Sequence, residues 1–233
     1  LTPLSLTSMK MTGEVNEKDR IITFKELDLN SGSASFTGTA LISDNNDGSL
    51  DLRGKINNWS HEDLKRLWPE DILPPVRKWY VNSVKNGVIT DGTVSVNLSA
   101  EEIKNKSIKP ESIDVTVFVK DVDLKYLNNL PKLSAASGKV KITPLTFRAD
   151  LESGNIKSIP ITEGHLQMIK DKFSVWNSEL NFGVMGDNYT MLEILNSKPL
   201  NIVEKFGIKP DQVSGISNST VKLGFPVRTD LNL

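Results

Sequence analysis

Apolar and polar side chains alternate strictly through residues 145–152, and this alternation constrains the fold more than any other feature of the chain. The apolar positions are Leu145, Phe147, Ala149 and Leu151, and each is followed by a polar or charged residue. Successive side chains of a β-strand point to opposite faces of its sheet. The stretch therefore predicts a strand that belongs to a sheet with one apolar face and one polar face.

Shorter ladders of the same kind recur along the 233 residues, and they predict a mainly β chain. They lie at 34–42, 50–52, 113–119, 140–142, 180–184 and 221–225. Asp47 and Gly48 predict a tight hairpin between the first two ladders. Residues 152–155 predict a turn after the ladder at 145–152.

Glycines recur beside apolar pairs within this series of strands. They are Gly54, Gly138, Gly164 and Gly215. A glycine inside a strand marks a bulge or a sharp coil of the sheet, and repeated coils let an antiparallel sheet curve into an open groove. Ordinary hairpin turns in a β-sandwich are the alternative interpretation.

Helices are few and interrupt the strands. Ser60 predicts the cap of a short helix, and Pro74 predicts the start of another that Gly87 ends, with a turn at Asp91 and Gly92 before the next strand. Near the C-terminus, Asp187 or Asn188 predicts a further cap. We therefore expect helical insertions near 60–86 and 187–206 in a mainly β fold.

Charge and composition exclude several classes of function. The net charge is −1, so there is no basic field that would attract nucleic acid. There is no cysteine, hence no disulfide framework, thiolate metal site or cysteine nucleophile. No apolar run approaches the roughly 20 residues that a membrane-spanning helix needs.

The sequence offers no catalytic or metal-binding constellation. His61 and His165 are far apart in the chain; we expect the first to be exposed on a helix and the second to lie on the polar face of a strand. The acidic run 44–48 lacks the later glutamate of a calcium loop and is better explained as a hairpin turn. We therefore expect no enzyme activity, no cofactor and no metal.

The segment 68–92 carries a resemblance to a known family. Its spaced motif consists of Trp68, Pro69, Pro74, Arg77, Trp79, Gly87 and Gly92. The motif resembles the AsmA-like, TamB-related proteins of Gram-negative envelopes, in particular the YhdP-type branch in its alphaproteobacterial form. Residues 122–127, 130–131 and 135–138 resemble the region that follows this helix in the family.

The resemblance implies a fold, a role and a location. The fold is a repeating β-groove that helps phospholipid move between the inner and outer membranes. The implied location is the periplasm, with the parent protein anchored in the inner membrane and an outer-membrane partner possible. We accordingly expect residues 1–233 to be a fragment of a longer AsmA-like protein. Within the motif, we expect Arg77 to make a structural ion pair and Trp68 and Trp79 to dock the helix on the sheet.

A groove of this kind would hold phospholipid acyl chains by non-directional burial. The expected lining residues are the apolar positions of the central and later ladders: Val115, Val117, Val140, Ile142, Leu145, Phe147, Ala149, Leu151, Leu166, Met168, Leu180, Phe182 and Val184. The alternative is an envelope scaffold or partner-binding β domain with a closed core. The sequence does not decide which apolar positions face lipid and which pack against helices.

Overall fold

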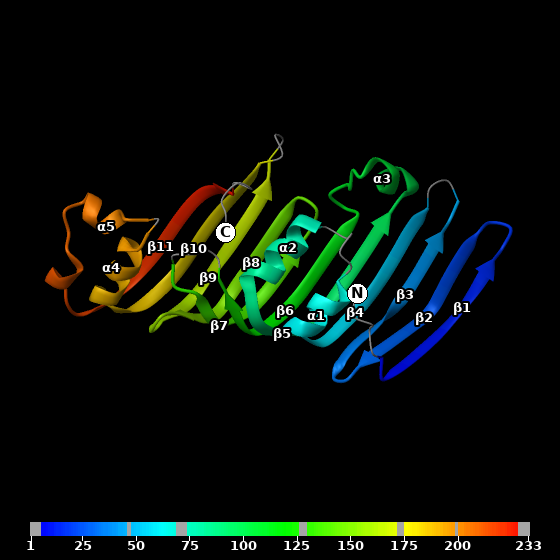
Figure 1. Ribbon diagram of the computed structural model, residues 1–233, viewed down its shortest axis with the longest axis horizontal. Coiled ribbons are helices and arrows are strands. Elements are labelled where there is room, and N and C mark those ends of the chain that lie inside the picture. The colour runs from blue at the N-terminus through cyan, green and yellow to red at the C-terminus, as the bar shows by residue number, and fades with distance from the viewer. Residues whose placement is uncertain are drawn as a thin grey trace. The chain divides into compact units, whose positions relative to one another are not determined.

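The computed structural model describes residues 6–45, 48–68, 74–125, 130–171, 175–198 and 200–227. Eleven strands form one antiparallel sheet in the order in which they occur in the sequence, from β1 to β11 (Figure 1). Within the described residues the sheet does not close into a barrel, because β1 and β11 each have a single neighbour. The expected fold class, a mainly β chain with an open antiparallel sheet and a few inserted helices, is confirmed.

The chain divides into two compact units, and each is described by itself. Unit 1 comprises Leu1–Pro69, Val88–Phe118 and Val140–Phe147. Unit 2 comprises Glu70–Gly87, Val119–Lys139 and Arg148–Leu233.

Unit 1 is built on the first strands, which lie side by side in Figure 1 from blue to cyan. They are β1 (Ser8–Asn16), β2 (Ile21–Ser31), β3 (Ala34–Ser43) and β4 (Ser49–Ser60), followed by most of β5 (Val84–Leu98) and the first part of β6 (Ile113–Leu124). Its helices are α1 (His61–Leu67) and α3 (Ala100–Asn105). The predicted hairpin between the first two ladders is confirmed as β3–β4, although Asp47 itself lies outside the described residues.

Unit 2 holds the later strands and the other helices. Its strands are most of β7 (Leu133–Ile142) and β8 (Thr146–Ile156), then β9 (Ile159–Lys170), β10 (Trp176–Asp187) and β11 (Ile216–Val227). Its helices are α2 (Pro74–Ser83), α4 (Asn188–Asn196), α5 (Ile202–Lys205) and the single 3₁₀ turn η1 (Pro210–Gln212). Helix α4 packs on β10, and α5 and η1 pack on α4 (Figure 1).

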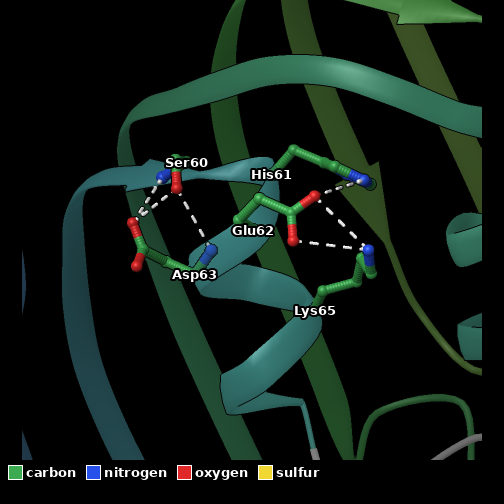
Figure 2. A network of polar contacts seen from close by, with 5 residues as sticks. All are labelled: Ser60, His61, Glu62, Asp63 and Lys65. Atoms are coloured by element: carbon green, nitrogen blue, oxygen red, sulfur yellow. Dashed lines mark hydrogen bonds and ion pairs between the residues drawn. The ribbon is translucent and has the colours of Figure 1, made fainter. Parts of the chain in front are cut away.

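Two predicted helix caps are confirmed. Ser60 Oγ accepts a hydrogen bond from the Asp63 N–H (3.1 Å), and Asp63 Oδ2 accepts in return from the Ser60 N–H (3.1 Å), which completes a capping box at the start of α1 (Figure 2). Asp187 caps α4 by accepting from the Thr190 N–H (2.8 Å).

Figure 2 also shows the side chain for which the sequence prediction was wrong. His61 is buried, with 8% of its surface exposed, rather than exposed in the first turn of α1. Its Nε2 lies 3.8 Å from Glu62 Oε1, and the same carboxylate contacts Lys65 Nζ at 3.3 Å. Helical position alone did not reveal the burial, because burial depends on the other elements that pack around the residue.

Two predicted turns are also wrong. Helix α2 ends at Ser83, and β5 continues without interruption from Val84 through Gly87, Asp91 and Gly92. Likewise, β8 runs unbroken through 152–155, and its turn comes at residues 157–158. Glycine at these positions has another role: a Cβ on Gly92 would lie 2.7 Å from Val117 Cγ1, so the residue permits close strand packing.

Candidate functional site: two apolar sheet faces

The pairing of β1 to β5 places apolar residues in rows that cross the strands of unit 1. Directly paired residues of antiparallel strands share a face of the sheet. The four rows are Val15/Ile22/Ile42/Leu50/Leu98, Gly13/Phe24/Ala40/Leu52/Val96, Met11/Leu27/Gly38/Gly54/Val94 and Met9/Leu29/Phe36/Ile56/Gly92. Every member is apolar or glycine. We call this surface, defined by these twenty residues, the unit 1 wall.

The opposite face of the same strands is polar. One of its rows is Lys10/Asp28/Thr37/Lys55/Thr93, and another is Glu14/Thr23/Leu41/Asp51/Asn97. Leu41 is the apolar exception in these two rows, and it is 38% exposed. The strands of unit 1 therefore separate an apolar surface from a polar one almost completely.

Most side chains of the unit 1 wall keep substantial exposure. Ile42 is 42% exposed and Met11 is 48% exposed, whereas Ala40 and Ile56 are buried. Met9, Gly13, Val15 and Ile22 are also exposed, Gly92 is buried, and the other members are half-buried. Large contiguous apolar surfaces that remain accessible mark binding sites for apolar partners. The wall is therefore the strongest candidate site in unit 1.

Unit 2 also has an apolar face, but part of it is covered. Phe182 and Val184 belong to a buried cluster with Leu133, Ala136, Ile156, Ile159 and Ile161. Met191 and Ile194 of α4 pack against this cluster. The cluster is thus a closed core at the α4 end of the face.

The remainder of the unit 2 face is more accessible. Leu180 pairs with Leu166 on one side and with Leu223 on the other, and all three are half-buried. Met168 continues this surface along β9 and is also half-buried. We call Leu166, Met168 and Leu223 the unit 2 open face; Leu180 lies beside them and packs against the buried cluster.

The structure places the expected lining residues on these strands. In β6 and β7 of unit 1, the ion pair between Lys141 Nζ and Asp114 Oδ2 (3.0 Å) marks the polar face, so Val115, Val140 and Ile142 lie on the apolar one. Val117 faces Gly92 and is buried.

The lining residues at the start of β8 need one correction. Leu145 precedes β8 and lies in a bend, where Thr143 Oγ1 accepts a hydrogen bond from the Leu145 N–H (3.4 Å). The observed strand therefore begins one residue later than the expected one. Phe147 lies in β8 and is half-buried. In unit 2, Arg148 donates to Gln167 Oε1 (3.4 Å), which assigns Arg148 to the polar face and Ala149 and Leu151 to the apolar one.

Sequence reasoning missed the unit 1 wall as a lining surface, although it found several of its strands. A register shift between Phe24 and Leu27 inserts an extra residue into β2. The apolar positions Ile22, Phe24, Leu27 and Leu29 therefore share one face although their spacing changes from two to three. A search that allowed one slip in the alternation would have found them.

The family motif falls at the C-terminal end of α1, within α2 and within β5. Trp68 caps the C-terminus of α1, its N–H donating to Leu64 O (3.0 Å). Pro74 begins α2, where Arg77 and Trp79 are half-buried, and Pro69 lies outside the described residues. Gly87 has φ 136° and a Cβ there would lie 2.8 Å from Val122 Cγ2. Both motif glycines of β5 therefore serve close packing, Gly87 in unit 2 and Gly92 in unit 1.

The most perturbed carboxylate has a structural role. Glu102 accepts hydrogen bonds from the Ser112 hydroxyl, the Lys109 N–H (2.9 Å) and the Ser99 hydroxyl (2.7 Å), and these lower its pKa to about 2. It is therefore ionised at neutral pH and ties α3 to the start of β6. Among the described residues, no group of histidine and acidic side chains is arranged to hold a metal ion.

Comparison with known proteins gives one match. The family model described as YhdP protein matches residues 2–231. The chain belongs to the YhdP family. This membership confirms the YhdP-type resemblance carried by the motif at 68–92, whereas its alphaproteobacterial form stays a prediction. It places this YhdP-family chain in an envelope-associated, non-enzymatic transport family. Neither a curated protein nor a solved structure gives a significant match. In the described part of the chain, no helix is both long and apolar enough to cross a bilayer.

Proposed function

We propose that this YhdP-family chain is a segment of a periplasmic, bridge-like protein that shields phospholipid acyl chains during transfer between the inner and outer membranes. The observation that carries the proposal is the unit 1 wall: twenty positions across five paired strands are apolar or glycine, and most remain accessible. Membership of an envelope lipid-transport family supports the same role.

The affinity comes from removing hydrocarbon from water. Each buried CH₂ group contributes about 0.8 kcal/mol, so a wall that covers part of an acyl chain supplies several kcal/mol. Such burial has no preferred direction, and a tail that slides along the wall exchanges one apolar contact for another of similar energy. The proposal therefore needs neither a catalytic residue nor a cofactor.

The polar face of the sheet fits an aqueous compartment. Lys10 pairs with Glu26 (2.7 Å) and Arg53 with Asp51 (3.2 Å) on the face opposite the wall. This face can stay in water while the wall contacts lipid tails. We further propose that an anchor outside this chain holds the parent protein in the inner membrane, and that a partner meets it at the outer membrane.

Two neighbouring residues of β3 give a matched test. Ile42 lies on the unit 1 wall and Leu41 on the polar face, and their exposures are similar, 42% and 38%. Phospholipid that co-purifies with the gently isolated protein is identified by mass spectrometry. The delipidated protein is then titrated with a fluorescent phospholipid.

The proposal predicts saturable binding by the wild type. Ile42→Glu reduces this binding at least tenfold, whereas Leu41→Glu leaves it within twofold, because only the first places a charge where the tail lies. A scaffold with a closed core would show no saturable lipid binding in any of the three proteins. That result would replace the proposal with the alternative of a partner-binding envelope domain.

A further inference from the structure

Two glycines face each other in the middle of the unit 1 wall. Gly38 of β3 pairs directly with Gly54 of β4, and the register of β4 with both neighbours is regular at this point. Of the two expected roles of this glycine, a bulge or a sharp coil of the sheet, the regular register excludes the bulge at Gly54. Its lack of a side chain needs a different explanation.

The ring of Phe36 occupies the space that a side chain of Gly54 would take. A Cβ on Gly54 would lie 2.5 Å from Phe36 Cε2, and closer still to Phe36 Cζ. Phe36 belongs to the next row of the wall, opposite Ile56. Its ring thus extends back over the backbone of Gly54, and the side chain is half-buried although it lies on an accessible face.

This arrangement keeps a large aromatic side chain low against the sheet. Cβ atoms do not approach other carbon atoms within 3.0 Å, so any side chain at position 54 would force the ring to another position. A displaced ring has to rotate about its side-chain bonds to another rotamer. A rotamer that stands up from the sheet would enter the space that an acyl chain on the wall would use.

We propose that Gly54 and Phe36 together set the height of the unit 1 wall, so that an acyl chain can cross β3 and β4 above the flat ring. This inference rests on the proposed function. Phe36 is then a positioning residue for the surface rather than an essential contact. The identity of residue 54 determines whether hydrocarbon has a continuous path over the centre of the wall.

Four proteins test the inference: the wild type, Gly54→Ala, Phe36→Ala and the Phe36→Ala/Gly54→Ala double variant. Each is delipidated and titrated with a fluorescent diacyl phospholipid, and circular dichroism reports the fold. We expect Gly54→Ala to weaken binding about tenfold. We expect the double variant to bind within twofold of Phe36→Ala, because neither has a ring to displace and residue 54 matters only while the Phe36 ring is present.

The double variant distinguishes the steric effect of the Phe36 ring from that of the neighbouring backbone. A Cβ on residue 54 would also lie 2.8 Å from the Thr37 carbonyl oxygen, and removing the ring does not relieve that contact. If Gly54→Ala fails to fold, recovery of both folding and binding in the double variant still supports the inference. A double variant that remains defective overturns it, since the carbonyl contact would then be the cause.

The remaining outcomes are equally decisive. Binding by Gly54→Ala equal to that of the wild type overturns the inference alone and leaves the proposed function intact. Loss of binding in Phe36→Ala also overturns it, because the ring would then be a required contact. Absence of saturable binding in the wild type refutes the proposed function and this inference together.

Discussion

Gly164 of β9 lies directly opposite Phe182 of β10, and a Cβ on Gly164 would come within 2.6 Å of the Cβ of Phe182. The same Cβ would also lie 2.8 Å from the Asn181 carbonyl oxygen. Phe182 belongs to the buried cluster of unit 2, and its Cα and Cβ lie against the glycine. In unit 2 the glycine therefore permits a close approach of two strands, whereas in unit 1 Gly54 leaves space for the ring of Phe36.

Gly164→Ala should destabilise the protein by about 1–3 kcal/mol, because the added methyl group overpacks the site against both a side chain and a backbone atom. Urea unfolding monitored by circular dichroism measures the change. Gly224→Ala in β11 is the matched control, since its Cβ would meet only the Ser178 carbonyl oxygen at 3.8 Å. An equal loss of stability in both variants would contradict the steric role assigned to Gly164.

Phe182→Glu and Leu166→Glu should have different consequences although both sites were expected to line the groove. Phe182 is 8% exposed within the cluster covered by α4, so an unpaired charge there should unfold unit 2. Leu166 is half-buried on the unit 2 open face, so its variant should keep the native circular dichroism spectrum while binding less phospholipid. Unfolding of both variants would show that the open face is core as well.

Stability should fall in acid partly through Glu102. Hydrogen bonds from Ser112, Lys109 and Ser99 lower its pKa from 4.5 to about 2 in the folded state. Because the folded pKa is the lower one, the stabilisation is fully present above about pH 4.5 and is lost as the pH falls towards 2.

Urea unfolding of the wild type and Glu102→Gln at several pH values checks this assignment. Above pH 4.5 the wild type should be the more stable protein, and the difference should shrink steadily between pH 4.5 and 2. Glu101→Gln is the control, because Glu101 is exposed on the same helix. A difference between wild type and Glu102→Gln that is constant over this range would contradict the role assigned to the carboxylate.

Features set by a few adjacent residues were predictable from the sequence. Ser60 and Asp187 cap their helices as expected, because a cap depends on one side chain and the next three residues. The alternation at 34–42 and 180–184 likewise gave strands, since period two is a property of the strand itself.

Features that depend on neighbouring strands were not predictable. Asp91 and Gly92 have the composition of a turn, yet Asp91 pairs with Asn57 and Gly92 with Ile56 within β5. The glycine is there because Val117 approaches it, a contact that lies outside its local sequence. The extra residue between Phe24 and Leu27 similarly interrupts the alternation of apolar and polar residues, although Phe24 and Leu27 lie on the same face of the sheet. The full unit 1 wall is defined by the register of five strands, which the local sequence of each strand does not specify.

The most direct test of the central claim asks which face of β3 touches hydrocarbon. A benzophenone amino acid is introduced at position 42 or at position 41, and each protein is loaded with phospholipid and irradiated. Mass spectrometry then identifies the crosslinked adduct. We expect position 42 to capture acyl chains and position 41 to capture none. Equal capture at both positions, or capture at position 41 alone, would contradict the claim that the unit 1 wall holds lipid tails.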